Sequence, residues 1–374
     1  MTDSAGRETG ETGNAGETGT AGEAGYGRAR GRRAALAAVV AAAVLALAAP
    51  LALGGEATAG ATGRTGPAEP TATTGPAGLT TLGFTEWTPI PRPSNPALER
   101  LVISRPIVFA RYTATDSIED LYTISPIGGA AVKLTNTPTV SDVMPSWSPD
   151  GKRVAFLRYG SGGAIDGIWT MKSTGGDLKP VPGTEGASDP AWSPDGKKIA
   201  YSRPVGTERE IYAADVDGTS ATRLTFTTED EYHPTWSPDG AYLAFSRADA
   251  SGHSRLMRIQ LSTLAQNPIT AAGSQDWTPD WSRGDRIVFS RVDSTGFAHL
   301  YVIRPDGTGE NRITSARAND KYPSWSPDGR RLVFTRGGTD DADPEHLFLV
   351  RGDGTALTQL TKTDSHDLEA DWRP

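Results

Sequence analysis

Cysteine is absent from this chain of 374 residues. Its absence excludes disulfides, cysteine-ligated zinc, a thiol nucleophile and a lipidated N-terminal cysteine. The five histidines form no His-x-x-x-His pair, so we do not expect a histidine-based metal centre. Neither a Gly-x-Ser-x-Gly elbow nor a glycine-rich phosphate loop that opens a helix is present. The sequence therefore predicts no cofactor, no metal site and no catalytic residue.

Positive charge is also in short supply, with 37 basic residues against 45 acidic ones and a net charge of −8. A nucleic-acid binder needs a basic face for the phosphates, so this class of protein is disfavoured. Turn-forming residues are abundant instead, with 43 glycines and 27 prolines. The chain also contains nine tryptophans, a high number for its modest apolar content. The length allows either two ordinary domains or one large repeat architecture.

The first hundred residues differ in composition from the rest. Residues 1–33 are rich in Gly, Glu, Thr and Ala, and we expect them to be a disordered leader, because they offer too little apolar surface to offset the entropy of ordering. Residues 34–53 form an uncharged apolar run behind an arginine-rich flank, which is typical of an export signal or a membrane anchor. Residues 54–97 are a Thr/Pro/Gly-rich linker.

Two alternatives stay open for this leader. The small residues around Ala57–Ala59 allow cleavage, yet the apolar run is long enough to span a bilayer uncut. The pair Arg32-Arg33 is compatible with twin-arginine export as well as with the general secretory route. In each case the prediction is an extracytoplasmic protein, either secreted or anchored to the cytoplasmic membrane by one N-terminal segment.

One repeat accounts for residues 98–374. The phrase Pro-x-Trp-Ser-Pro-Asp-Gly, intact or degraded, returns at six tryptophans that lie 45, 44, 45, 44 and 47 residues apart: Trp147, Trp192, Trp236, Trp281, Trp325 and Trp372. Proline fixes φ at the second position of the predicted turn, and glycine is free to adopt positive φ at the fourth. A period of about 40–45 residues with several short strands is typical of a β-propeller blade.

Each repeat contains four predicted strands. The tryptophan strand and its turn are followed by a β-prone, apolar return strand, such as Val154-Ala-Phe156. A third strand follows, such as Ile168-Trp169. The fourth strand ends in Leu-Thr, as at Leu224-Thr225. Six units give a six-bladed, all-β propeller. The first return strand lacks a tryptophan strand before it, so we expect residues 370–374 to supply the inner strand of the first blade and close the ring.

The sixfold Trp-Ser-Pro-Asp-Gly phrase with its downstream Leu-Thr resembles the WD40-like (PD40) repeat of the TolB family over residues 98–374. The resemblance implies a six-bladed propeller. Full-length TolB also has an α/β domain before its propeller, and in this sequence that region is only leader and linker. The resemblance therefore does not imply that this chain performs the task of TolB in an outer-membrane Tol–Pal system.

Five of the six residues that stand five places before a repeat tryptophan are acidic: Asp142, Glu231, Asp276, Asp320 and Asp367. One interpretation is an acidic ring at one mouth of the central channel, which would bind a metal ion, a Lys/Arg-bearing peptide or another cationic group. The other is a set of ion pairs within the blades, because every return strand ends in arginine and hairpin pairing brings the two positions together. Arg203 alone faces no acid, since its partner position is Ala187.

A second group of candidate binding residues lies between these acids and the tryptophans: Tyr232, His233, Trp277, Lys321 and Tyr322. Aromatic side chains on a rim are common anchors for a peptide or sugar. The alternative is ordinary packing between neighbouring blades. The repeat tryptophans and phenylalanines themselves are expected in the core.

Two functions follow from these patterns. The first is a non-catalytic, monomeric module that binds a protein, a peptide or a glycan at the cell envelope. The second is a hydrolase or lyase that uses rim carboxylates such as Glu231 and Asp276 as general acid and base. The sequence favours the first, because it contains no recognisable catalytic motif.

Overall fold

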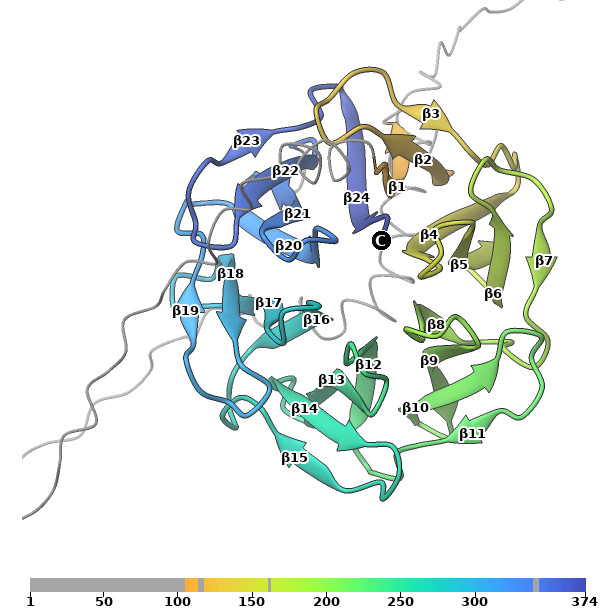
Figure 1. Cartoon of the computed structure of the whole chain (residues 1–374), viewed down its shortest axis with the longest axis vertical. Helices are drawn as coiled ribbons and strands as arrows, with labels where there is room; N and C mark the ends of the chain where they lie inside the picture. Colours follow the sequence, from red (N-terminus) through yellow and green to blue (C-terminus); the bar gives the residue numbers. More distant parts are fainter. Residues whose placement is uncertain (1–104, 114–117, 161–162, 339–342) are drawn as a thin grey trace, which may run out of the picture.

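The computed structural model describes residues 105–113, 118–160, 163–338 and 343–374. Within these ranges the chain forms six antiparallel four-stranded sheets, arranged as blades around a central axis (Figure 1). This arrangement confirms the predicted six-bladed all-β propeller. The described residues include no helix of the length and apolarity that a membrane crossing requires. The predicted leader, apolar segment and linker lie outside the described residues.

The first three blades contain the strands β1 to β11, and blade 1 also contains the last strand of the chain. Blade 1 contains β1 (Ile107–Thr113), β2 (Asp120–Ile124), β3 (Val132–Lys133) and, as its inner strand, β24 (Ser365–Trp372). Blade 2 runs from its inner strand outward through β4 (Val140–Trp147), β5 (Arg153–Gly160), β6 (Ile165–Lys172) and β7 (Lys179–Pro180). Blade 3 runs through β8 (Ser188–Trp192), β9 (Lys198–Val205), β10 (Glu208–Asp215) and β11 (Thr222–Arg223).

The remaining three blades follow the same order from the axis outward. Blade 4 contains β12 (Asp230–Trp236), β13 (Tyr242–Ala248), β14 (Ser254–Gln260) and β15 (Gln266–Pro268). Blade 5 contains β16 (Asp276–Trp281), β17 (Ile287–Val292), β18 (Ala298–Ile303) and β19 (Asn311–Arg312). Blade 6 contains β20 (Asn319–Trp325), β21 (Arg331–Gly337), β22 (His346–Arg351) and β23 (Thr358–Gln359).

Ring closure is confirmed and is longer than predicted. β24 begins at Ser365 rather than near residue 370, and it pairs with β1 from Thr113↔Ser365 to Ile107↔Trp372. The last residues continue the contact, because the Arg373 amide donates to the Pro106 carbonyl 3.1 Å away. One sheet therefore joins the two ends of the folded region, and β1 is paired on both sides.

The repeated Ser-Pro-Asp-Gly phrase builds a self-contained turn. In blade 2 the Ser148 hydroxyl donates to Asp150 Oδ1 over 2.8 Å, and the Gly151 amide donates to the Ser148 carbonyl over 2.8 Å. Gly151 has φ 65°, a left-handed conformation that glycine adopts without a steric cost. The Ser148 hydroxyl also accepts from the Arg153 amide, so the turn fixes the start of the return strand.

The Leu-Thr element ends the blade differently from the prediction. The outermost strands are only two or three residues long and stop before Leu-Thr. The threonine hydroxyl instead accepts a hydrogen bond from a third-strand amide, as in Thr225 Oγ1 with the Ile211 amide at 2.9 Å. The same bond occurs in the other blades, at Thr135, Thr184, Thr270, Thr314 and Thr361. The threonine therefore satisfies a strand amide where the outer strand no longer pairs.

Apolar clusters between adjacent blades form the core. The return-strand aromatics are completely buried in every blade, as predicted: Phe109, Phe156, Tyr201, Phe245, Phe289 and Phe334. Five of the six repeat tryptophans are at most 9% exposed, and Trp192 is half-buried. One cluster, for example, joins Phe109 and Trp372 of blade 1 to Leu347 and Val333 of blade 6. Blade-to-blade packing thus supplies the hydrophobic contribution to folding.

Candidate functional site: the inner strands around the central axis

All five repeated acids lie at the start of an inner strand, opposite the predicted arginine. Strand register pairs Asp142 with Arg158 and Glu231 with Arg247, and it pairs Asp367 with Arg111 across the ring closure. The other two pairs, in blades 5 and 6, are Asp276 with Arg291 and Asp320 with Arg336. The carboxylates are 0% exposed. The ion pairs proposed from the sequence are therefore present in five blades.

The geometry of these pairs is two-pronged in four cases. Arg158 donates from Nε to Asp142 Oδ1 over 2.7 Å and from Nη2 to Asp142 Oδ2 over 2.9 Å. Burial raises the pKa of the Asp142 carboxyl, and the Arg158 guanidinium opposes that rise. The guanidinium also lies 4.4 Å from the centre of the Trp169 ring, which adds a cation–π contact. Each pair thus fixes the open end of its hairpin.

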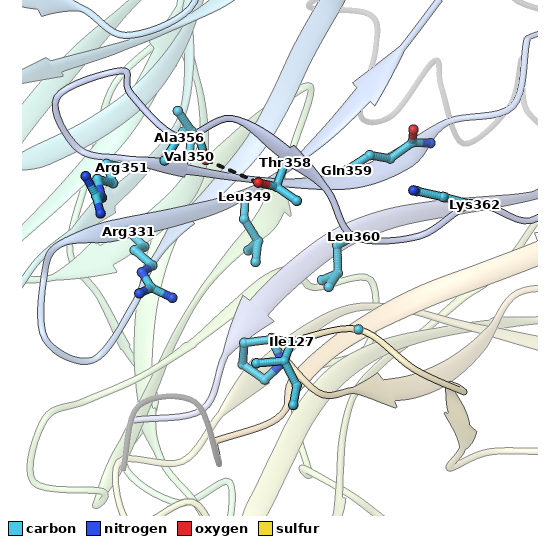
Figure 2. A pocket seen from close by; sticks show the side chains of 12 residues that line it. Ile127, Arg331, Leu349, Val350, Arg351, Ala356, Thr358, Gln359, Leu360 and Lys362 are labelled. Carbon is cyan, nitrogen blue, oxygen red and sulfur yellow. Dashed lines mark hydrogen bonds between the residues drawn. The ribbon is translucent and has the colours of Figure 1, made fainter. Parts of the chain in front are cut away.

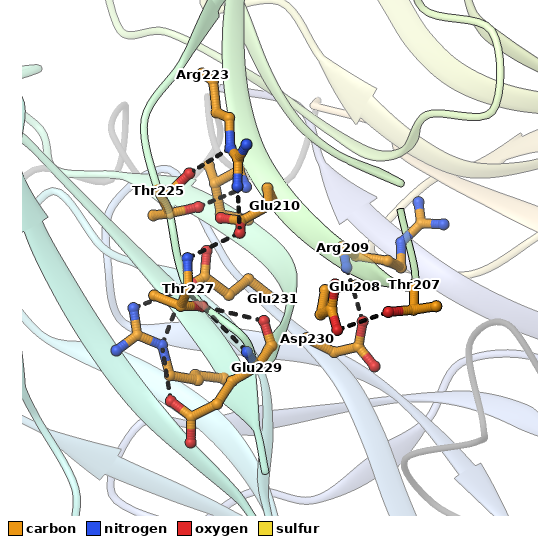
Figure 3. Close-up of polar contacts among 12 residues, drawn as sticks. Thr207, Glu208, Arg209, Glu210, Arg223, Thr225, Thr227, Glu229, Asp230 and Glu231 are labelled. Carbon is orange, nitrogen blue, oxygen red and sulfur yellow. Dashed lines mark hydrogen bonds and ion pairs between the residues drawn. The ribbon is translucent and has the colours of Figure 1, made fainter. Parts of the chain in front are cut away.

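The fifth pair belongs to a larger polar network between blades 3 and 4 (Figure 3). Both Arg247 donors contact the same oxygen, Glu231 Oε1, at 2.9 and 2.6 Å. The neighbouring Glu210 accepts from Arg223 Nη2 at 2.7 Å and from the Thr227 amide at 2.8 Å. Glu231 and Asp276, the candidate general acid and base, are each fully buried and in contact with their own arginine. A binding role for the five acids stays a prediction.

Blade 3 departs from this pattern. Ala187 stands where the acid is expected, and the Arg203 side chain turns to the Gly183 carbonyl, 3.0 Å away. Arg209, from the third strand β10, fills the vacant interior and donates to the Ser188 hydroxyl over 2.7 Å. Asp189 belongs to the same cluster, because the Ser188 hydroxyl also donates to its carboxylate. The sequence analysis predicted that Arg203 has no acidic partner. It did not predict that Arg209 would occupy the position that the arginine of the ion pair has in the other blades.

A further sixfold feature was missed by the sequence analysis. The residue three places before each repeat tryptophan adopts positive φ, between 51° and 57°, and none of the six is glycine: Met144, Asp189, His233, Thr278, Tyr322 and Glu369. The ladder register shifts at this point in all six inner strands. A non-glycine residue in this region is strained and is common at functional sites. Four of these residues make contacts between neighbouring inner strands, His233 with Asp189 and Met144 with Glu369.

Asp189 and His233 are two members of this ring and meet across blades 3 and 4. His233 Nε2 lies 3.6 Å from Asp189 Oδ1, and their side chains are 13% and 3% exposed. Asp189 Oδ2 accepts from the hydroxyls of Ser188 and Ser202 at 2.9 and 2.5 Å. Among the described residues, Asp189 Oδ1 and both ring nitrogens of His233 have no hydrogen-bond partner. Unmade hydrogen bonds of buried groups are costly, which singles out this pair.

The pair has a defined charge state at neutral pH. Burial alone would raise the pKa of Asp189, but His233, Arg209 and the two serine hydroxyls hold that pKa below its ordinary value. Burial lowers the pKa of His233, and Arg209 adds to this effect against the attraction of Asp189. An ionised carboxylate therefore lies beside a neutral imidazole.

The candidate aromatics divide between packing and the left-handed ring. Tyr232 and Trp277 are 7% and 3% exposed and pack on each other with ring centroids 6.5 Å apart, which matches the packing alternative. Lys321 and Tyr322 are half-buried on β20, and Tyr322 has φ 52°. The structure therefore brings Tyr232, His233 and Trp277 together, whereas Lys321 and Tyr322 lie two blades further along the ring from His233.

Three other carboxyls of the inner strands join neighbouring blades. Asp371 Oδ2 accepts from the Trp147 amide at 2.6 Å and Asp280 Oδ2 from the Trp325 amide at 2.7 Å. Glu369 Oε2 accepts from the Met144 amide at 2.7 Å. Burial raises the pKa of Asp280 to about 6, of Asp371 to about 7 and of Glu369 to about 8. The described residues contain no cluster of three or more potential metal ligands.

These three acids predict an unusual pH dependence. Each folded-state pKa is raised above its unfolded value, so the stabilising contribution is complete below about pH 4 and is lost as the pH rises through the folded values. We expect the Tm to fall by about 5 °C or more between about pH 6 and about pH 9. Differential scanning fluorimetry across this range measures the effect. The variant Asp280→Asn/Glu369→Gln/Asp371→Asn should be much less sensitive, and a Tm of the unchanged protein that rises over this range would contradict the prediction.

Comparison with known proteins agrees with this architecture. A family model described as TolB beta propeller domain, PD40, matches residues 104–374. TolB of Acinetobacter baumannii is similar in structure, with a TM-score of 0.63, 19% identity, and coverage of 73% of this chain and 67% of that chain. A protein described as TolB from Agrobacterium tumefaciens is also similar in structure, with a TM-score of 0.57 and 21% identity. The match covers 72% of this chain and 99% of that chain.

The same fold occurs in proteins of other kinds. Hydrazine synthase of Kuenenia stuttgartiensis matches with a TM-score of 0.58 and 13% identity, over 72% of this chain and 46% of that one. Comparison with curated protein sequences gives no significant match. Structural likeness at these identities shows the fold alone. The four Trp-Ser-Pro-Asp-Gly turns, the closure by β24 and the match over residues 104–374 together show that this chain belongs to the TolB β-propeller (PD40) family.

Proposed function

We propose that this propeller is a non-catalytic module that binds a protein or peptide on the outer side of the cytoplasmic membrane. The observation that carries the proposal is the Asp189–His233 pair, whose buried polar atoms lack hydrogen-bond partners among the described residues. A ligand that donates to Asp189 Oδ1 and to the unprotonated imidazole nitrogen, and that accepts from the imidazole N–H, would supply the missing bonds. Membership of the TolB propeller family and the arginine-flanked apolar segment support an extracytoplasmic location.

The position of this pair also favours binding. Asp189 and His233 belong to adjacent inner strands, at the one junction where an arginine from the third strand replaces the usual ion pair. Because five blades repeat one design and this one does not, stability of the fold alone does not explain the difference. The aromatic pair Tyr232 and Trp277 packs beside His233 and gives it a rigid support.

The test is capture of a partner by the full-length protein in membranes of the source cell. Asp189→Asn/His233→Ala is expected to reduce the captured amount about tenfold or more, because buried charge-assisted bonds are lost. A matched control is available in blade 4, where His253 Nδ1 lies 3.8 Å from Asp249 Oδ1 with both side chains more than 40% exposed. Asp249→Asn/His253→Ala should retain capture. Equal capture by both variants, or no partner with the unchanged protein, would contradict the proposal.

A further inference from the structure

A pocket of about 440 Å³ lies where blade 6 meets blade 1, away from the central axis (Figure 2). Blade 6 lines most of it through β22, β23 and the turn between them, and blade 1 contributes the turn after β2, residues 126–128. Three of the lining side chains are cationic: Arg331, Arg351 and Lys362. None of the lining residues is acidic, although the chain as a whole carries a net charge of −8.

Two of these cations face each other directly. Strand pairing places Arg331 of β21 opposite Arg351 of β22, and like charges in directly opposite positions destabilise a sheet. Within the described part of the chain, the side chains of Arg331, Arg351 and Lys362 form no hydrogen bond or ion pair with another residue. Asp353 is close to Arg351, but Asp353 Oδ1 is engaged by the amide and hydroxyl of Thr355.

The other blades show how this position is normally neutralised. In blade 3 the equivalent cation is Lys198, and the residue opposite it is Asp215, with Nζ and Oδ1 2.7 Å apart. In blade 2 Arg153 lies opposite Lys172, which repeats the like-charge arrangement of blade 6. There, however, Arg153 Nη1 donates to Asp177 Oδ2 over 3.0 Å. Blade 2 thus carries its own counter-ion.

Blade 6 lacks the counter-ion at the corresponding residue. Register pairs Thr170 with Lys179 in blade 2 and Leu349 with Thr358 in blade 6, so Asp177 corresponds to Ala356, two places earlier. The backbone confirms the equivalence, because Asp177 and Ala356 have φ of 50° and 57°. Ala356 is one of the residues that line the pocket. A methyl group therefore stands where blade 2 has a carboxylate, and this leaves both the charge and the space for a bound anion.

The rest of the lining is apolar. Leu349 and Leu360 of blade 6 point toward Ile127 of blade 1 across the pocket (Figure 2). Ile127 is 75% exposed, the largest exposed fraction among the large apolar residues of the described chain. An apolar group placed between these side chains would be removed from water together with them. The pocket therefore combines a cationic side with an apolar side.

We propose that this pocket binds a small organic anion. Its acid group lies between Arg331 and Arg351 and takes the place that the Asp177 carboxylate has in blade 2. Its apolar body lies against Leu349, Leu360 and Ile127. Planar guanidinium groups hold carboxylates and phosphates through paired hydrogen bonds, which suits such an acid group. This proposal is independent of the Asp189–His233 pair.

The test uses hexanoate as the probe, with inorganic phosphate and hexan-1-ol as comparisons, titrated by calorimetry into the full-length protein. Hexanoate is expected to bind in the millimolar range, and each comparison about tenfold or more weaker, because each supplies only one side of the interaction. Ala356→Asp, which installs the counter-ion of blade 2, should reduce hexanoate affinity about tenfold or more and raise the Tm. A higher Tm would show that the loss of binding does not come from unfolding.

Ala265→Asp on the exposed edge of blade 4 is the matched control, since it makes the same change in charge far from the pocket. It should leave hexanoate affinity unchanged. Three results would overturn the proposal: no hexanoate binding, phosphate or hexan-1-ol binding as tightly as hexanoate, and equal hexanoate affinity in Ala356→Asp and the unchanged protein. Failure to capture a protein partner has no bearing on these outcomes.

Discussion

Removal of residues 365–374 is expected to prevent the propeller from folding. β24 is the inner strand of blade 1, and its Trp372 is 2% exposed in the cluster that joins blades 1 and 6. Without it, β1 would present an unpaired edge, and Arg111 would lose the buried Asp367 carboxylate. We expect loss of the cooperative thermal transition in circular dichroism and elution as aggregate in gel filtration.

Two controls separate closure from a general effect of truncation. Removal of Arg373 and Pro374 alone should leave a folded protein with a slightly lower Tm, because it costs one backbone hydrogen bond and the contact of Arg373 with the Trp147 ring. A peptide of residues 363–374 added to the truncated chain should restore the transition, since it supplies the missing strand. A truncated protein with an unchanged transition would refute the role assigned to β24.

Asp142→Ala is expected to destabilise the protein by about 3–5 kcal/mol, the usual cost of leaving one partner of a buried ion pair alone. The Arg158 side chain is only 9% exposed and would retain its charge while it loses its two hydrogen bonds to Asp142. Urea unfolding followed by tryptophan fluorescence measures the loss. Addition of Arg158→Met should recover most of it, because the apolar side chain packs on Trp169 without a buried charge.

Blade 3 provides the matched comparison for this prediction. There the chain already carries Ala187 opposite an arginine, and Arg203 is directed to the surface and the Gly183 carbonyl. Arg203→Ala should therefore cost less than about 1 kcal/mol, as expected for an exposed polar contact. Equal losses in Asp142→Ala and Arg203→Ala would show that burial of the pair does not determine its contribution.

The repeat made much of the fold predictable. The spacing of the tryptophans predicted the blades, and the unpaired return strand at Ile107 predicted closure. The acid–arginine pairs could also be predicted, because in four blades both residues belong to one hairpin, and in blade 1 the predicted closure brings them together. The predicted end of the outer strand was wrong. The hydroxyl of the Leu-Thr threonine accepts a hydrogen bond from the backbone of the third strand, and the outer strand stops before it.

The contents of the candidate sites were less predictable. His233 was chosen from the sequence, but its partner Asp189 was not, because the bulge that turns both residues out of the ladder leaves no signal in residue type. The replacement of a carboxylate by Ala356 has meaning only after strand register aligns it with Asp177. Exposed alanine is common in any sequence, so this substitution carried no information by itself.

The sequence by itself determined the number of blades, their turns, the closing strand and the ion pairs within five of the six blades, because these depend on local strand pairing and a regular period. Only the tertiary structure decided which residues meet between blades. Asp371 reaches the amide of Trp147, 224 residues earlier in the chain, and Arg331 of blade 6 and Ile127 of blade 1 line one pocket between these blades. Contacts of this kind depend on how six similar blades are angled around one axis, and no spacing within a single repeat specifies that angle.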